Sequence, residues 1–167
     1  MIFNANRKQF EQTVRAYSAD LYRFAYALCR DRFLAEDLVQ LAFERAWKNW
    51  GDLREPVAVK SWLLTIVRRE HARSYERKQL DTTDDDPEEL LLASHHQPGA
   101  QLEMEQLVES MPLAYREALL LQVLGGYSCA EIAAILDTTE GAVMTRLSRA
   151  RQALRSHWPA TELRRVK

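Results

Sequence analysis

The feature that most constrains the fold is a helical spacing of apolar residues that begins near the N-terminus. Apolar side chains recur there at steps of three and four residues, at Phe10, Val14, Tyr17, Leu21, Phe24 and Leu28. This spacing places them on one face of an amphipathic helix. The chain contains only five Gly and five Pro, and its apolar segments do not alternate with polar residues as strands do. The sequence therefore predicts an all-α fold.

Two more helices are predicted in the first half of the chain. One covers residues 35–50 and is ended by Gly51 and Asp52, residue types that commonly follow a helix. The other covers residues 57–78. Its first half is apolar and its second half is basic and polar. A helix of this kind is expected to pack at one end and to present charge at the other.

The 24 acidic and 23 basic residues, which give a net charge of −1, are unevenly distributed. Residues 68–78 hold five basic residues against two acidic ones, and residues 140–167 hold seven against two. Residues 81–105 lie between these segments and carry eight acidic residues without a Lys or Arg. Two basic segments that suit binding to phosphates thus flank an acidic one.

The acidic segment has the composition of a linker. Residues 79–99 contain charge runs, two Pro and no sustained apolar periodicity. This predicts two small helical domains, at residues 1–78 and 100–167, joined by an acidic flexible linker at residues 79–99. We also hypothesise that the linker folds back onto a basic helix and competes with DNA, the simpler alternative being a solvated spacer.

A helix-turn-helix is predicted in the second domain. Ser128 and Glu131 make an S-x-x-E capping box at the start of a helix over residues 129–136. Residues 137–139 supply a turn before a second helix over residues 140–157. The apolar residues of the two helices are spaced so that the helices can pack where they cross. A helical hairpin with a solvated basic face is the alternative interpretation.

The outer face of the 140–157 helix is predicted to enter the major groove of DNA. Its first turns can reach base edges with Glu140, Ala142, Thr145 and Arg146. Contacts with phosphates are predicted for Arg149, Arg151 and Arg155 farther along this helix, and for Tyr127 and Ser128 before the preceding one.

Other classes of function are poorly supported. The sequence has no Gly-rich phosphate loop and no set of metal ligands, so we expect no enzyme activity, metal, cofactor or small-molecule substrate. The adjacent His95 and His96 cannot share a helix face and are assigned to the linker. Cys29 and Cys129 are expected to be buried reduced thiols, with a redox pair as the less favoured alternative.

The absence of a bilayer-length apolar stretch and of a signal-peptide core predicts a cytoplasmic location.

Two further stretches accompany the helix-turn-helix: AEDLVQLAFERAWKNW at residues 35–50 and VKSWLLTIVRREHARSYERK at residues 59–78. Together the three resemble extracytoplasmic-function sigma factors of bacterial RNA polymerase over nearly the whole chain. The resemblance implies a transcription initiation factor. Its first domain would bind the clamp of polymerase β′ and the minus-10 promoter element, and its second the minus-35 element and the flap of β. It also implies control by an anti-sigma factor, often anchored in the inner membrane.

The resemblance also assigns roles to residues of the first domain. The clamp-binding motif D-x-x-Q of the family maps to Asp37 and Gln40, which share a helix face. Leu41 stands where the family usually has an acidic residue. The residues predicted to bind polymerase are Asp37, Gln40, Leu41 and Glu44. An ordinary pair of surface residues is the alternative interpretation of the motif.

Binding of the minus-10 element is implied for residues 51–57, which would hold a flipped base, and for the basic half of the following helix. The residues predicted to track the single strand are Arg68, Arg69, His71, Arg73, Tyr75, Arg77 and Lys78. His71 and Tyr75 would either stack on bases or pack against the domain.

The recognition helix departs from the family pattern of G-T-V followed by a basic residue. Ala142 and Met144 lack the hydroxyl and the charge of that pattern, although apolar side chains can contact the methyl group of thymine. Two alternatives to a sigma factor stay open. One is a stand-alone helix-turn-helix regulator, which would not need the clamp motif, and the other is a homologue that serves only as an interaction scaffold.

Overall fold

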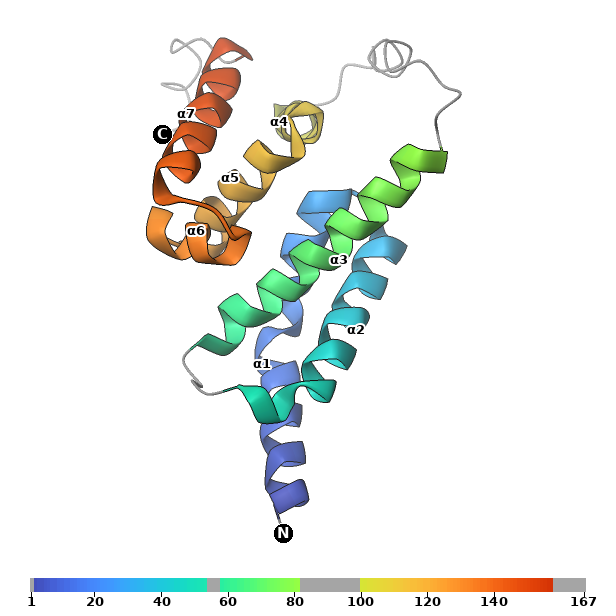
Figure 1. Cartoon of the computed structure of the whole chain (residues 1–167). Helices are drawn as coiled ribbons and strands as arrows, with labels where there is room; N and C mark the ends of the chain where they lie inside the picture. The colour runs from blue at the N-terminus through green and yellow to red at the C-terminus, as the bar shows by residue number, and fades with distance from the viewer. Residues whose placement is uncertain (1, 54–57, 82–99, 158–167) are drawn as a thin grey trace.

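The computed structural model describes residues 2–53, 58–81 and 100–157, and over these ranges it is helical without a strand. This confirms the predicted all-α fold of two helical domains. The first domain consists of α1 (Ile2–Cys29), α2 (Arg32–Lys48), the short 3-10 helix η1 (Trp50–Asp52) and α3 (Val59–Asp81). The second consists of α4 (Ala100–Ser110), α5 (Leu113–Gly125), α6 (Cys129–Leu136) and α7 (Glu140–His157) (Figure 1). Most of the predicted linker, with its fold-back and its histidines, lies outside the described residues.

The first domain is a bundle in which α1, α2 and α3 each pack against the other two. The second half of the predicted apolar face of α1 is buried, with Leu21 and Leu28 fully enclosed, whereas Phe10, Val14 and Tyr17 are half-buried. On α2 the buried positions are mostly small, at Ala35, Leu38, Ala42 and Ala46, which lets the neighbouring helices approach closely. The core of the first domain is thus built on the spacing read from the sequence.

Helix α2 begins three residues before the predicted start. The side chain of Asp31 caps it by accepting a hydrogen bond from the backbone N–H of Leu34 at 3.0 Å. Asp is a favoured N-cap because its carboxylate satisfies an N–H that has no partner within the helix. The predicted helix started at residue 35, so the first turn of α2 was missed.

Helix α1 also extends beyond the prediction, starting at Ile2 rather than near Phe10. The ring of Phe10 lies 6.2 Å from that of Phe43 and 5.0 Å from those of Trp47 and Trp50. Such edge and tilted contacts between aromatic rings add to the stabilisation from burial. They tie the N-terminal part of α1 to the end of α2 and to η1.

The second domain contains the predicted helix-turn-helix. Both bonds of the capping box are present, from Glu131 N–H to Ser128 Oγ at 3.2 Å and from Ser128 N–H to the Glu131 carboxylate at 2.8 Å. The bounds of α6 and α7 agree with the predicted ranges. At the start of α5, Pro112 is the N-cap, and Gly126 ends that helix with a φ of 67°.

The two domains lie against each other, which the sequence analysis did not predict. Helix α5 packs against α1, and α6 packs against α3 (Figure 1). Buried residues of both domains join in one continuous apolar cluster. The fold therefore places the second domain, which contains the helix-turn-helix, beside the basic helix α3 of the first domain.

Two smaller expectations concern the cysteines and the membrane. Cys29 and Cys129 are free thiols, but each is half-buried rather than fully enclosed. Partial burial raises the pKa of the Cys29 thiol, which disfavours the reactive thiolate. Over the described residues, no helix combines the length and apolar character that a membrane span requires.

Candidate nucleic-acid interface

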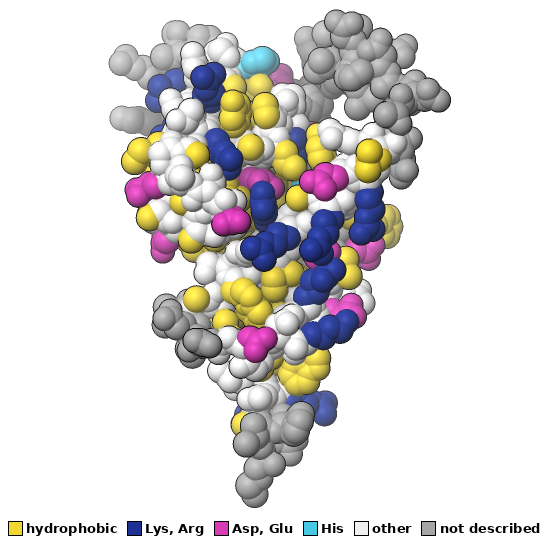
Figure 2. All heavy atoms as spheres, viewed as in Figure 1, with side chains coloured by type: hydrophobic (Ala, Val, Ile, Leu, Met, Phe, Trp, Pro, Cys, Tyr) yellow, Lys and Arg dark blue, Asp and Glu magenta, His cyan; other side chains and the backbone are white. Residues whose placement is uncertain are grey.

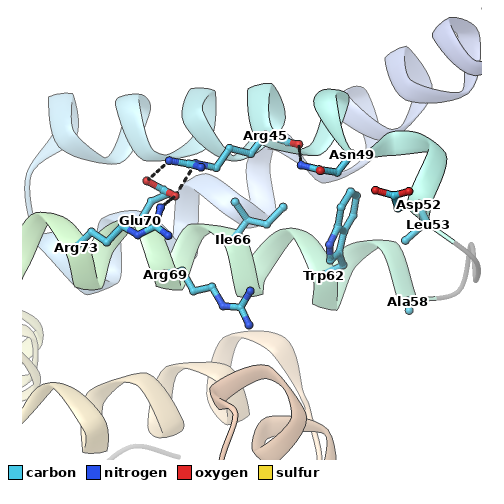
Figure 3. Close-up of a pocket in the computed structure, with 10 residues that line it drawn as sticks. All are labelled: Arg45, Asn49, Asp52, Leu53, Ala58, Trp62, Ile66, Arg69, Glu70 and Arg73. Carbon is cyan, nitrogen blue, oxygen red and sulfur yellow. Dashed lines mark hydrogen bonds and ion pairs between the residues drawn. The ribbon is translucent and has the colours of Figure 1, made fainter.

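A pocket of about 670 Å³ opens between α2 and α3, next to η1 (Figure 3). The indole of Trp62 and the side chain of Ile66 form its apolar wall. Leu53 and Ala58 add to the apolar part of the lining. The other lining residues are polar or charged, and they are Arg45, Asn49, Asp52, Arg69, Glu70 and Arg73. An aromatic ring beside an amide and several guanidinium groups suits an unpaired base with its phosphate.

Glu70 organises the cationic side of this pocket. Its carboxylate is mostly buried and accepts from Arg45 Nε at 2.6 Å and from Arg73 Nη1 at 2.9 Å (Figure 3). Arg69 extends from α3 away from α2 and makes no ion pair with any residue that the structure describes. Two guanidinium groups therefore pair with the Glu70 carboxylate. With Arg69 and Asp52, three arginines and two carboxylates line the pocket, which leaves it a small net positive charge.

The basic half of α3 presents Lys and Arg side chains on the surface of the molecule. Figure 2 shows these side chains gathered over α3 on the face turned toward the viewer. Five of the seven residues predicted to contact the minus-10 element are exposed, namely Arg69, Arg73, Tyr75, Arg77 and Lys78. These five residues and the pocket therefore lie along the same helix, α3.

The other two predicted minus-10 residues point toward the second domain. Arg68 Nε lies 3.2 Å from Glu117 Oε1 of α5. His71 is only 3% exposed. Burial, together with the nearby charge of Arg116, lowers the pKa of His71 to about 4, so its ring is neutral at neutral pH. In this arrangement Arg68 is only partly exposed. The burial of His71 agrees with the alternative that it packs against the domain and not with stacking on a base.

The predicted minus-35 residues form a mostly exposed face on α7. Glu140, Thr145, Arg149 and Arg151 are exposed, whereas Ala142 and Arg146 are half-buried. The inner face of α7 holds the buried Val143, Leu147 and Ala150. Thr139 caps the helix by accepting from the N–H of Ala142 at 3.2 Å. The outer side of α7 is thus exposed, and its entry into a groove of DNA stays a prediction.

At the start of α6, Ser128 and Tyr127 differ in their surroundings. Ser128 is exposed and caps the helix. Tyr127 lies over Gly125, where a Cβ atom would come within 2.5 Å of its ring, so a larger residue at 125 would displace it. Tyr127 also lines a groove between the domains with Tyr17 and Lys60. The predicted phosphate contact of Tyr127 is therefore on the side of α6 that faces the first domain.

The predicted polymerase-binding residues share the outer face of α2. Asp37, Gln40, Leu41 and Glu44 are all exposed. Phe33 is 78% exposed and precedes Asp37 by one helical turn, so it belongs to the same face. Phe33 was not among the predicted residues, although its spacing of four residues from Asp37 was a signal. An exposed aromatic ring beside polar groups is typical of a surface that binds a protein.

Comparison with known proteins matches both halves of the chain. Residues 13–80 match the family model described as Sigma-70 region 2, and residues 101–154 match Sigma-70, region 4. The chain is 31% identical over 154 residues to the ECF RNA polymerase sigma factor SigC of Mycobacterium tuberculosis, covering 89% of this chain and 83% of that protein. It is 30% identical over 161 residues to the RNA polymerase sigma factor RfaY of Xanthomonas campestris, covering 90% of this chain but only 40% of that protein.

Among solved structures, the chain resembles the sigma factor RpoE of Bartonella quintana, determined in complex with the anti-sigma factor NepR. The TM-score is 0.71 and the sequence identity 28%, and the match covers 89% of this chain and 96% of that one. The similarity spans both helical domains.

Proposed function

Because the chain belongs to the extracytoplasmic-function family of RNA polymerase sigma factors, we propose that it recruits core polymerase to promoters and contacts both promoter elements itself. Members of this family are initiation factors and not enzymes. The observation that carries the proposal is the combination of three surfaces on one chain: the α2 face, the α3 pocket with its basic helix, and the outer face of α7. A stand-alone DNA-binding regulator would need only the last of these.

The α2 face is proposed to bind the clamp of the β′ subunit. Asp37 and Gln40 lie one turn apart and can accept and donate hydrogen bonds to a basic coiled coil. Leu41, exposed beside Gln40, lacks the charge usual at its position. We infer that Leu41 and Phe33 replace part of that electrostatic contact by burying apolar surface.

The α3 pocket is proposed to hold an unpaired base of the minus-10 element. Trp62 would stack on the base, and Asn49, whose side-chain N–H donates to Arg45 O at 2.8 Å, keeps its amide oxygen for the base edge. Arg69 and Arg73 would neutralise the adjoining phosphates, because both are exposed at the rim. Tyr75, Arg77 and Lys78 extend the track along α3.

Helix α7 is proposed to bind the minus-35 element through the major groove. Its N-terminal residues Glu140, Ala142, Thr145 and Arg146 are assigned to base edges, and Arg149 and Arg151 to phosphates. The functional domains are proposed as residues 1–78 and 100–167, with the second also binding the flap of the β subunit.

Substitutions of Arg146 and Arg149 by Ala are expected to have different consequences for promoter binding. Loss of a base contact by Arg146→Ala should weaken binding by about tenfold or more and alter the preferred base. Loss of a phosphate contact by Arg149→Ala should weaken binding to all sequences and reduce the slope of log affinity against log salt by about 0.9. Titration of polymerase holoenzyme on promoter libraries at several salt concentrations measures both. The division of roles is wrong if the two variants behave alike.

An anti-sigma factor is the proposed regulator, acting on the protein in the cytoplasm or holding it at the inner membrane. The support is the similarity to the Bartonella sigma factor, which was solved with the anti-sigma factor NepR. A pull-down of the whole chain from its native cells tests both partners. Retention of the core polymerase subunits is expected in induced cells and of a second small protein in uninduced cells. Retention of neither would contradict the proposed function.

A further inference from the structure

Met144 is a large apolar residue on the exposed side of α7. It is 54% exposed, whereas the neighbouring Val143 and Leu147 are buried. A single exposed apolar residue is common on a protein surface, and its position decides what it can contact. Met144 is the fifth residue of α7. It therefore lies in the part of a recognition helix that reaches base edges.

Two arginines follow Met144 along the same line of the helix. Arg151 and Arg155 come seven and eleven residues after it, which is the spacing of residues on one side of an α-helix. Both are exposed. Positive side chains on this line suit the phosphates of DNA, whereas the centre of a surface that binds a protein is depleted in charged residues. These arginines therefore favour DNA as the partner of Met144.

The side chains around Met144 offer few hydrogen-bond donors to a base. Ala142 has none, and a Glu140 carboxylate only accepts. Thr145 Oγ1 donates to the carbonyl of Gly141 at 3.1 Å. This bond uses the hydroxyl hydrogen within the helix, so Thr145 offers a base its methyl group and an acceptor. Recognition by the first two turns of α7 thus depends largely on methyl groups and acceptors, with Arg146 as the donor.

Gly141 leaves room beside Met144. A Cβ atom at Gly141 would meet no atom beyond its own turn of helix within 4 Å, so the packing of the protein does not require glycine there. Glycine destabilises a helix relative to alanine, and it occurs where a backbone approaches a ligand closely. Gly141 lies three residues before Met144 and is its neighbour on the helix surface. The missing side chain lets a base pair come close to Met144.

We propose that Met144 contacts the methyl group of a thymine in the minus-35 element and so determines the preferred base at one position. This role rests on the proposed function, which places α7 in the major groove. Thymine is the base that presents a methyl group in that groove. The flexible thioether of Met can fill the irregular space around this methyl group.

The experiment uses polymerase holoenzyme formed with the full chain. Selection of bound duplexes from a random library identifies the minus-35 element, in which we expect a thymine at the position that Met144 contacts. Replacing each thymine of the element by uracil, one at a time, removes only a methyl group. At the position of Met144 this change should weaken binding about fourfold, as expected for one buried methyl group.

Three variants assign the effect to Met144. Met144→Ala should bind thymine and uracil equally at this position. Met104→Ala is the matched control, because Met104 is an exposed Met of the same domain on α4, and it should keep the wild-type preference. Met144→Arg should prefer guanine at this position, because a guanidinium can donate to both O6 and N7 of guanine.

Several results would overturn the role of Met144. They are a selected element without thymine, equal binding of thymine and uracil by the wild-type protein at every position, and unchanged sensitivity to uracil in Met144→Ala. A Met144→Arg variant that still prefers thymine at this position would overturn it as well. If the wild-type holoenzyme selected no element at all, the proposed function itself would be wrong, and the role of Met144 would fall with it.

Discussion

Replacing Asp37 and Gln40 together by Ala is expected to weaken the binding of core polymerase by about a hundredfold or more. Hydrogen bonds that involve a charged partner each contribute about 1.5–3 kcal/mol, and 1.4 kcal/mol corresponds to a factor of ten. Both side chains are exposed, so the fold should lose no more than about 0.5 kcal/mol. A titration of labelled protein with core polymerase measures the affinity, and chemical unfolding checks the stability.

The matched control for this pair is Glu11→Ala with Gln12→Ala. These residues are an exposed acid and an exposed amide on α1, where no contact with polymerase is proposed. The control should bind core polymerase as the wild-type protein does. Equal losses in the two double variants, or no loss in the first, would show that the α2 face does not bind the clamp.

Replacing Arg116 by Met is expected to lower the free energy of unfolding by about 3–5 kcal/mol. Arg116 donates to the carbonyls of Leu28 in the last turn of α1 and of Glu109 and Met111 where α4 ends. Met is long enough to fill the space but leaves these three carbonyls without their donor and removes the cation beside Glu117. Breaking a buried charged network has a cost of this size. Urea unfolding followed by circular dichroism measures it.

Arg151→Met is the control for this substitution. Arg151 is an exposed arginine of the same domain that donates to Gln122 of α5. Its loss should change stability by about 0.5 kcal/mol or less. If the Arg116 variant were as stable as this control, the guanidinium would not join the helix ends in solution.

Local patterns in the sequence were sufficient to predict the helix-turn-helix and the buried faces. The capping box at Ser128 and the turn at residues 137–139 set the ends of α6 and α7, because both act within a few residues. The failures at α1 and α2 are also local. A cap at Asp31 and the aromatic contacts of Phe10 were not recognised as extending these helices.

The contact between the domains could not be predicted in this way. An acidic, Pro-containing linker indicates where two domains are joined but not whether they pack. The one available signal was the pair Arg116 and Glu117 within the otherwise apolar α5, since charged residues are seldom buried without partners. Their partners, Leu28 O and Arg68, are 88 and 49 residues away. For the same reason the sequence could not show that His71 and Arg68 face inward.

The central claim is that this chain directs polymerase to promoters. Its most direct test is to transcribe native genomic DNA with purified core polymerase, with and without the protein, and to sequence the 5′ ends of the transcripts. The predicted result is a set of new start sites that appear only when the protein is present and share sequence elements near positions −10 and −35. Binding of the protein to DNA without core polymerase, combined with an unchanged set of start sites, would contradict the account and favour a stand-alone regulator.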